Sequence, residues 1–110
     1  MNALVVVDGG ICGFQTRIHA ESDDSLNVTF KIASACEKVQ AFGDALTAKG
    51  PVDGYAEIGV GSDGVVLTIA REILKGCCAA CAVPVGAFKA MQVAAAVALP
   101  KDVTIKISSE

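Results

Sequence analysis

Residues 14–32, FQTRIHAESDDSLNVTFKI, decide the fold because they contain two alternating strands and the turn between them. In residues 14–21 the apolar side chains and Thr16 fall on one face of an extended chain, and the other polar side chains fall on the opposite face. The polar cluster at 22–25 predicts a turn, and residues 26–32 continue the alternation after it. These residues therefore predict two half-buried antiparallel strands.

A shorter apolar run precedes this pair of strands. Leu4–Val7 predicts a first strand, and Asp8-Gly9-Gly10 provides a turn after it. Three consecutive strands joined by short turns predict an antiparallel meander.

The hydrophobic period changes from two residues to about 3.6 residues at Ser34. Ser34 and Glu37 have the spacing of a capping box, which predicts a helix that ends at Lys49-Gly50-Pro51. Residues 51–64 contain several glycine turns and predict a loop with one helical turn at 55–58.

The last part of the chain predicts two helices and a strand. The second helix is expected from Val65 to Lys75-Gly76, and a third helix is expected from Pro84 to Pro100. The third helix is apolar nearly all round, which predicts a central position. Asp102–Ile107 alternates again and predicts a C-terminal strand. The order of elements predicts an α+β domain, with an antiparallel three-stranded meander plus a C-terminal strand and helices packed on one face.

Length and charge restrict the classes of function. The 110 residues fit a single domain, 1–110, with a formal charge of −3 from 9 Lys and Arg against 12 Asp and Glu. The basic residues are scattered singly, so no nucleic-acid partner is expected. The most apolar stretch, Gly76–Leu99, is interrupted by proline, glycine, lysine and glutamine, so no membrane partner is expected. No basic residue precedes the first apolar run, and we expect a cytoplasmic protein without a signal peptide.

Five cysteines are more than a domain of this size needs for stability. Cys12 lies in a glycine-rich turn between two strands, Cys36 lies in the first turn of a helix, and Cys77, Cys78 and Cys81 open the last helix. Because helix N-termini stabilise thiolates, these positions favour metal ligands or nucleophiles. Strand direction places Cys12 and Cys36 at the same end of the sheet. The two-residue spacing between Cys78 and Cys81 lets both sulfurs reach one metal ion or form a redox pair.

Other polar residues predict a solvated surface. The single histidine, His19, falls on the outward face of its strand between Arg17 and Glu21. Asp23-Asp24 falls in a turn without a partner base. Neither position predicts catalysis.

The cysteines and their neighbours follow one another in a defined order: Cys12-Gly13, then Phe30–Cys36 running into a helix, then Cys77, Cys78 or Cys81 ahead of Ala87–Ala90. This order resembles the iron–sulfur scaffold proteins of the IscU/NifU N-terminal type. The resemblance implies an IscU-like fold and cysteine ligands for a cluster. Phe14 stands where that family has an Asp, no His precedes the last cysteine, and the family's chaperone-docking motif is absent. The whole sequence also resembles small proteins of anaerobic bacteria and archaea that share a Cys-Ala-Ala-Cys-x-Val-Pro-Val-Gly stretch and have no established activity.

The leading hypothesis is a metal- or iron–sulfur-binding protein with Cys12, Cys36, Cys78 and Cys81 as ligands and Cys77 as an alternate. All-thiolate ligation suits zinc or an iron–sulfur cluster. The partner that this hypothesis implies is a cluster-donor or cluster-acceptor protein. Phe14 in place of Asp predicts a metal that is retained.

Two other hypotheses stay open. One is thiol redox or sulfur-relay chemistry at Cys78 and Cys81, with Cys36 as a partner of low pKa. Since no base accompanies these thiols, redox or sulfur-relay chemistry is favoured over acyl transfer. Over all hypotheses, we expect a binding protein rather than an enzyme. The other is a structural or oligomerisation module with buried cysteines, in which the Ala-rich last helix packs in a homodimer.

Overall fold

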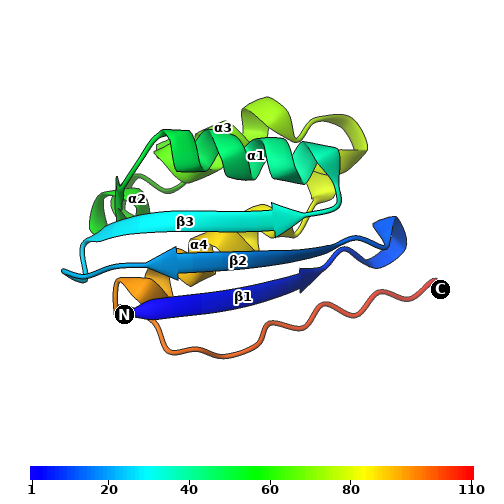
Figure 1. The fold of residues 1–110 in the computed structure, drawn as a ribbon. Helices are drawn as coiled ribbons and strands as arrows, with labels where there is room; N and C mark the ends of the chain where they lie inside the picture. The colour runs from blue at the N-terminus through cyan, green and yellow to red at the C-terminus, as the bar shows by residue number, and fades with distance from the viewer.

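The sheet is the meander that the alternating segments predict. A computed structural model describes residues 1–110. The strands β1 (Asn2–Asp8), β2 (Gln15–Glu21) and β3 (Asn27–Ser34) pair antiparallel in sequence order, and the short strand β4 (Val52–Asp53) pairs with β3 (Figure 1). The protein is therefore an α+β domain with one four-stranded antiparallel sheet, and the predicted fold class is confirmed.

Helices cover one face of this sheet. They are α1 (Glu37–Ala48), α2 (Gly54–Val60), α3 (Val65–Ile73) and α4 (Val83–Ala94), and the 3-10 turns are η1 (Gly10–Cys12), η2 (Gly61–Asp63) and η3 (Gly76–Ala80). The helix α4 packs on β1 and β2, whereas α1 packs on β3 and α3. In Figure 1, α4 passes behind the sheet, and α1 and α3 lie beyond β3. The central position predicted for the last helix is confirmed.

The inner face of the meander forms the core. In β2 and β3 the buried residues are ones that the alternation predicts, Thr16, Ile18, Ala20, Val28, Phe30 and Ile32. Phe14 and Leu26 are exceptions, because they precede β2 and β3 and are exposed. Their predicted places on the inner face are therefore wrong.

The fourth strand is not the one predicted. Asp102–Ile107 is extended but belongs to no sheet, whereas Val52 pairs with Val28 and is buried. A two-residue strand is too short to show an alternating pattern, so the sequence of residues 51–64 predicted only a loop and one helical turn there. The structure has β4, α2 and η2 in that segment.

The first helix begins later than the capping-box spacing predicts. Ser34 remains in β3 opposite Thr16, and its Oγ accepts a hydrogen bond from the backbone N of Cys36 at 3.2 Å. Cys36 is therefore the N-cap residue and α1 starts at Glu37. The predicted capping box of Ser34 and Glu37 is wrong because the sheet ladder holds Ser34 in a strand.

The last helix ends earlier than Pro100. Ala94 and Ala95 are the final buried residues of α4 and its cap, and Ala96 then adopts a left-handed φ of 61°. Residues from Val97 onward are exposed. The residues after Ala95 therefore lack the packing of an apolar face that stabilises most helices in proteins.

The segment Gly76–Ala94 is apolar enough to resemble a membrane span. It has 19 residues and a mean hydropathy of 1.5, which satisfy the length and composition of a crossing helix. A core helix satisfies the same two criteria. Here η3 ends at Ala80, Cys81 is extended, and α4 packs on β1 and β2.

Helix α1 approaches β3 closely through Gly43. A Cβ at this position would lie 2.7 Å from Cβ of Ile32, which is the stem of a buried side chain and has little room to move. Gly59 in α2 provides a contrast, because a Cβ there would meet no atom within 4 Å.

We expect Gly43→Ala to lower the free energy of unfolding by about 1–3 kcal/mol, although alanine favours helices, because an added methyl group overpacks the core. Urea unfolding followed by circular dichroism measures the change. Gly59→Ala is the matched control and should be neutral or stabilising. Equal effects of the two substitutions would contradict the close approach of α1 to β3.

Candidate functional site

Cysteines from three separate segments lie at one end of the sheet. The turn η1 with Cys12 connects β1 to β2, and Cys36 follows directly after β3. The register pairs Thr16 with Ser34, which places both of these segments at the same end. Figure 1 shows that the connection from α3 to α4, which carries Cys78 and Cys81, also lies at this end. The expectation that Cys12 and Cys36 share one end of the sheet is confirmed.

Cys12 lies at the tip of a tight loop. The backbone N of Gly9 donates a hydrogen bond to the carbonyl oxygen of Phe14 at 2.9 Å, and the N of Gly13 donates to that of Gly10 at 2.9 Å. Gly10 and Gly13 have φ values of 70° and 76°, which an L side chain rarely adopts. These glycines allow the loop to close, and Cys12 is exposed at its tip.

Cys36 is held by polar side chains at the junction of β3 and α1. The hydroxyl of Thr16 donates to Oγ of Ser34 at 2.9 Å, and this Oγ accepts from the backbone N of Cys36. Gln40 accepts a bond from the N of Ser34 through Oε1 and donates one to the carbonyl of Ile32 through Nε2, each at 2.9 Å. Gln40 was not identified from the sequence as a residue that joins α1 to the end of β3. Its position one turn into the helix is the signal that was available.

Cys78 and Cys81 lie at the entry to α4. The backbone N of Cys81 donates to the carbonyl of Cys78 at 3.1 Å, which closes η3. Both side chains are half-buried and pack against the core, whereas Cys77 is exposed. The N–H of Val83, in the first turn of α4, donates to the Cys81 sulfur.

Cys81 is the centre of the thiol group. Burial raises the pKa of its thiol, the hydrogen bond from Val83 partly opposes this, and the thiols of Cys36, Cys78 and Cys12 raise the pKa further by like-charge repulsion. These three thiols therefore lie close enough to Cys81 to interact with its charge. Cys77 exerts no such effect. We call Cys12, Cys36, Cys78 and Cys81 the thiol group.

The thiol group is not arranged as a metal site. In this structure no three His, Cys, Asp or Glu side chains are close enough together to hold one metal ion. All five cysteines are free thiols. Charge repulsion acts over longer distances than ligation, which brings sulfurs to about 4 Å from one another around a zinc ion.

A groove of about 600 Å³ runs beside Cys78 and Cys81 between α3 and α4. Its walls are apolar, and Arg71 and Lys75 are its two basic residues. No motif in the sequence predicted this groove. The helical spacing of Leu67, Ala70, Arg71 and Leu74, which all line the groove, is the signal that was available.

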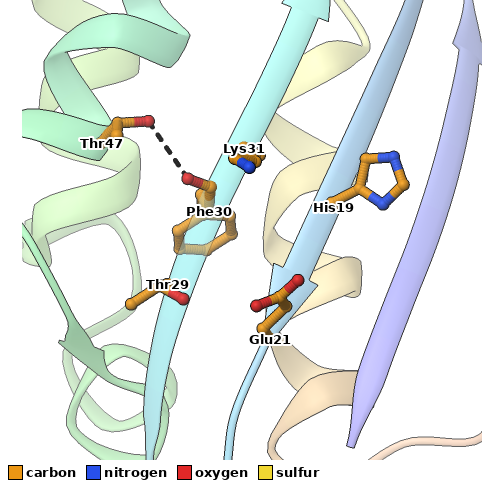
Figure 2. Close-up of a pocket in the computed structure, with 6 residues that line it drawn as sticks. All are labelled: His19, Glu21, Thr29, Phe30, Lys31 and Thr47. Carbon is orange, nitrogen blue, oxygen red and sulfur yellow. Dashed lines mark hydrogen bonds between the residues drawn. The ribbon is translucent and has the colours of Figure 1, made fainter.

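His19 lies away from the thiol group, on the exposed face of the sheet. It lines a hollow of about 200 Å³ with Glu21, Lys31 and three other residues, and Figure 2 shows that none of them is a cysteine. In the same view the Thr47 hydroxyl donates to the carbonyl of Phe30 at 3.2 Å. The predicted surface position of His19 is confirmed.

Two carboxylates have structural roles. The Asn27 side chain, with the backbone N–H groups of Asn27 and Leu26, donates hydrogen bonds to Asp24 and holds the pKa of that carboxyl well below its usual range. This arrangement agrees with the turn predicted there. Glu57 is buried and accepts bonds from the backbone N atoms of Val65 and Val66 at 3.0 and 2.7 Å. It caps α3, a role that was not predicted.

Comparison with known sequences places nearly all of the chain in one family. A family model matches residues 3–107. The chain belongs to the family of unknown function DUF6951. No curated protein and no solved structure matches the chain. The family match includes all five cysteines and the extended residues 102–107, and the resemblance to IscU/NifU scaffolds stays a prediction.

We expect Cys36→Ser to lower the pKa of the Cys81 thiol, because the substitution removes one of the thiols that raise it by like-charge repulsion. Cys81 should then react with iodoacetamide at lower pH than in the unsubstituted chain, as followed by mass spectrometry of its peptide. Cys77→Ser is the control and should leave the pH profile of Cys81 unchanged. The same profile in both variants would show that Cys36 does not interact with Cys81.

Proposed function

We propose that this protein binds a metal ion or an iron–sulfur cluster through Cys12, Cys36, Cys78 and Cys81. The observation that supports the proposal is the gathering of four free cysteines, from three separate segments, at one end of the sheet. Cysteines that serve only as small core residues have no reason to gather in this way. Cys77 is exposed and does not interact with Cys81, so it is left as the alternate ligand.

The donor set fits a soft metal. Four sulfur ligands suit zinc or an iron–sulfur cluster, and thiolates that repel one another are stabilised by a cation between them. Because the thiols are not at ligand distances in this structure, binding requires the thiols to move closer together. Cys12 and Cys78 lie in short 3-10 turns that contain no fully buried residue, so a movement of these turns would not open the core.

Thiol redox or sulfur-relay chemistry at Cys78 and Cys81 is the second candidate. The groove beside these residues favours it, because a substrate with an apolar body and a negative group would fit between the apolar walls and the two basic side chains. The raised pKa of Cys81 weighs against it, because a smaller fraction of this thiol is nucleophilic thiolate near neutral pH.

The third hypothesis, in which all five cysteines are core residues, is wrong for Cys12 and Cys77, which are exposed. The alanines of α4 are also not free to pack against a second chain. Ala87, Ala90 and Ala94 are buried within one chain, in the helix that packs on β1 and β2.

We expect the metal-free protein to bind Co²⁺ at one ion per chain, with the intense near-ultraviolet absorption of cobalt–thiolate bonds. Cys36→Ser should weaken Co²⁺ binding by at least the roughly 10- to 100-fold that even a residue supporting a ligand contributes. Cys77→Ser is the matched control and should bind as the unsubstituted chain does.

Metal and sulfide analysis after anaerobic purification then distinguishes zinc from an iron–sulfur cluster. Stoichiometric iron with acid-labile sulfide supports a cluster, and stoichiometric zinc without sulfide supports a single ion. Sub-stoichiometric metal that Cys36→Ser does not change would refute the proposal.

A further inference from the structure

The two edges of the sheet differ in how they are protected. The β4 edge is two residues long and follows Pro51 directly. The β1 edge is seven residues long and pairs with β2 without a bulge, from Asn2 opposite Glu21 to Asp8 opposite Gln15. Proteins usually blunt a free edge with proline, lysine, a bulge or a short strand. β1 has none of these, and its only charged residue is Asp8 at its end.

The side chains of β1 also leave apolar surface beside this edge. Leu4 and Val6 are 49% and 46% exposed on the face of the sheet that carries no helix. A long, apolar strand with unpaired backbone groups is a template for another strand.

The same chain contains a strand-like segment without a sheet. Residues 102–107, DVTIKI, are extended, and in the view of Figure 1 they run below β1, in the same direction as that strand, to the C-terminus. No backbone hydrogen bond involves a residue after Val97. Val103, Ile105 and Ile107 are 55%, 71% and 90% exposed and alternate with Thr104 and Lys106. The match to the family extends through residue 107, so this segment belongs to the pattern that members of the family share.

We propose that a second copy of this chain covers the β1 edge, with Asp102–Ile107 of each copy added as a strand to β1 of the other. Within one copy the edge has no strand and the segment has no sheet. In a dimer with two-fold symmetry, the segment of each copy pairs with β1 of the other copy. The backbone groups of both β1 edges and of both segments are then hydrogen-bonded. The period of two places Val103, Ile105 and Ile107 on one face of the extended sheet.

The second copy is favoured over other occupants because the chain itself supplies the complementary strand. Another protein would have to compete with this segment for the edge. The chain's own segment leaves its apolar side chains exposed in this structure and forms no hydrogen bond with β1. The proposal does not depend on the metal-binding proposal, because it involves a different surface and no cysteine.

Sedimentation velocity tests the oligomeric state of the full chain. We expect a species of twice the chain mass of 11.2 kDa. Ile105→Lys should raise the dissociation constant of this dimer at least tenfold, because the introduced charge falls on the apolar face of the added strand. Thr104→Lys is the matched control, since it introduces the same charge on the opposite face, and should remain dimeric. Circular dichroism should show the same fold in both variants, because the segment makes no hydrogen bonds within one copy.

Photo-crosslinking then identifies what lies beside the segment. Benzoylphenylalanine replaces Ile105 in a mixture of isotopically light and heavy chains. The expected product joins a light chain to a heavy chain, between the segment and the tryptic peptide that ends at Arg17. A monomer, a crosslink confined to single chains, or a dimer that persists when the chain is ended after Pro100 would each overturn the proposal.

Discussion

Two helices lie directly on the inner face of the meander because each has a glycine where it touches a strand. In α1, a Cβ at Gly43 would lie 2.7 Å from Cβ of Ile32, and in α4 a Cβ at Gly86 would lie 2.6 Å from Cγ2 of Val7. Any larger residue would hold the helix away from the sheet. Both helices begin at the end of the sheet that carries the cysteines.

The thiol group is a consequence of that arrangement. Cys36 is the N-cap of α1, Cys81 lies two residues before α4, and Cys12 lies in the turn that the meander places at the same end. Burial and mutual repulsion keep the Cys81 thiol protonated to higher pH than an ordinary thiol. A group of this kind loses protons more readily when a cation is present, so metal binding and proton release are coupled.

The local sequence pattern was sufficient to predict most of the helices and strands. The alternation of residues 14–32 predicted two strands, and the positions of all five cysteines at the ends of elements were apparent before any geometry was known. The predictions failed where tertiary contacts outweighed local pattern. Ser34 stays in the sheet although its spacing to Glu37 is that of a capping box, and α4 ends at Ala94 although apolar residues continue beyond it. The alternating C-terminal segment was predicted to be the fourth strand, but the fourth strand of the sheet is the two-residue β4.

The sequence by itself determined the α+β class, the order of the meander and the placement of His19 on its outer face, because alternation and helical period are local properties of the chain. It also determined that Cys12 and Cys36 share one end of the sheet, since strand direction follows from a meander. Only the tertiary structure decided that Cys78 and Cys81 are half-buried against the core, whereas Cys77 is exposed. It also decided that the groove between α3 and α4 lies beside them, and that residues 102–107 find no partner in their own chain. These features depend on how the helices pack on the sheet, and that packing is set by side chains far apart in the sequence.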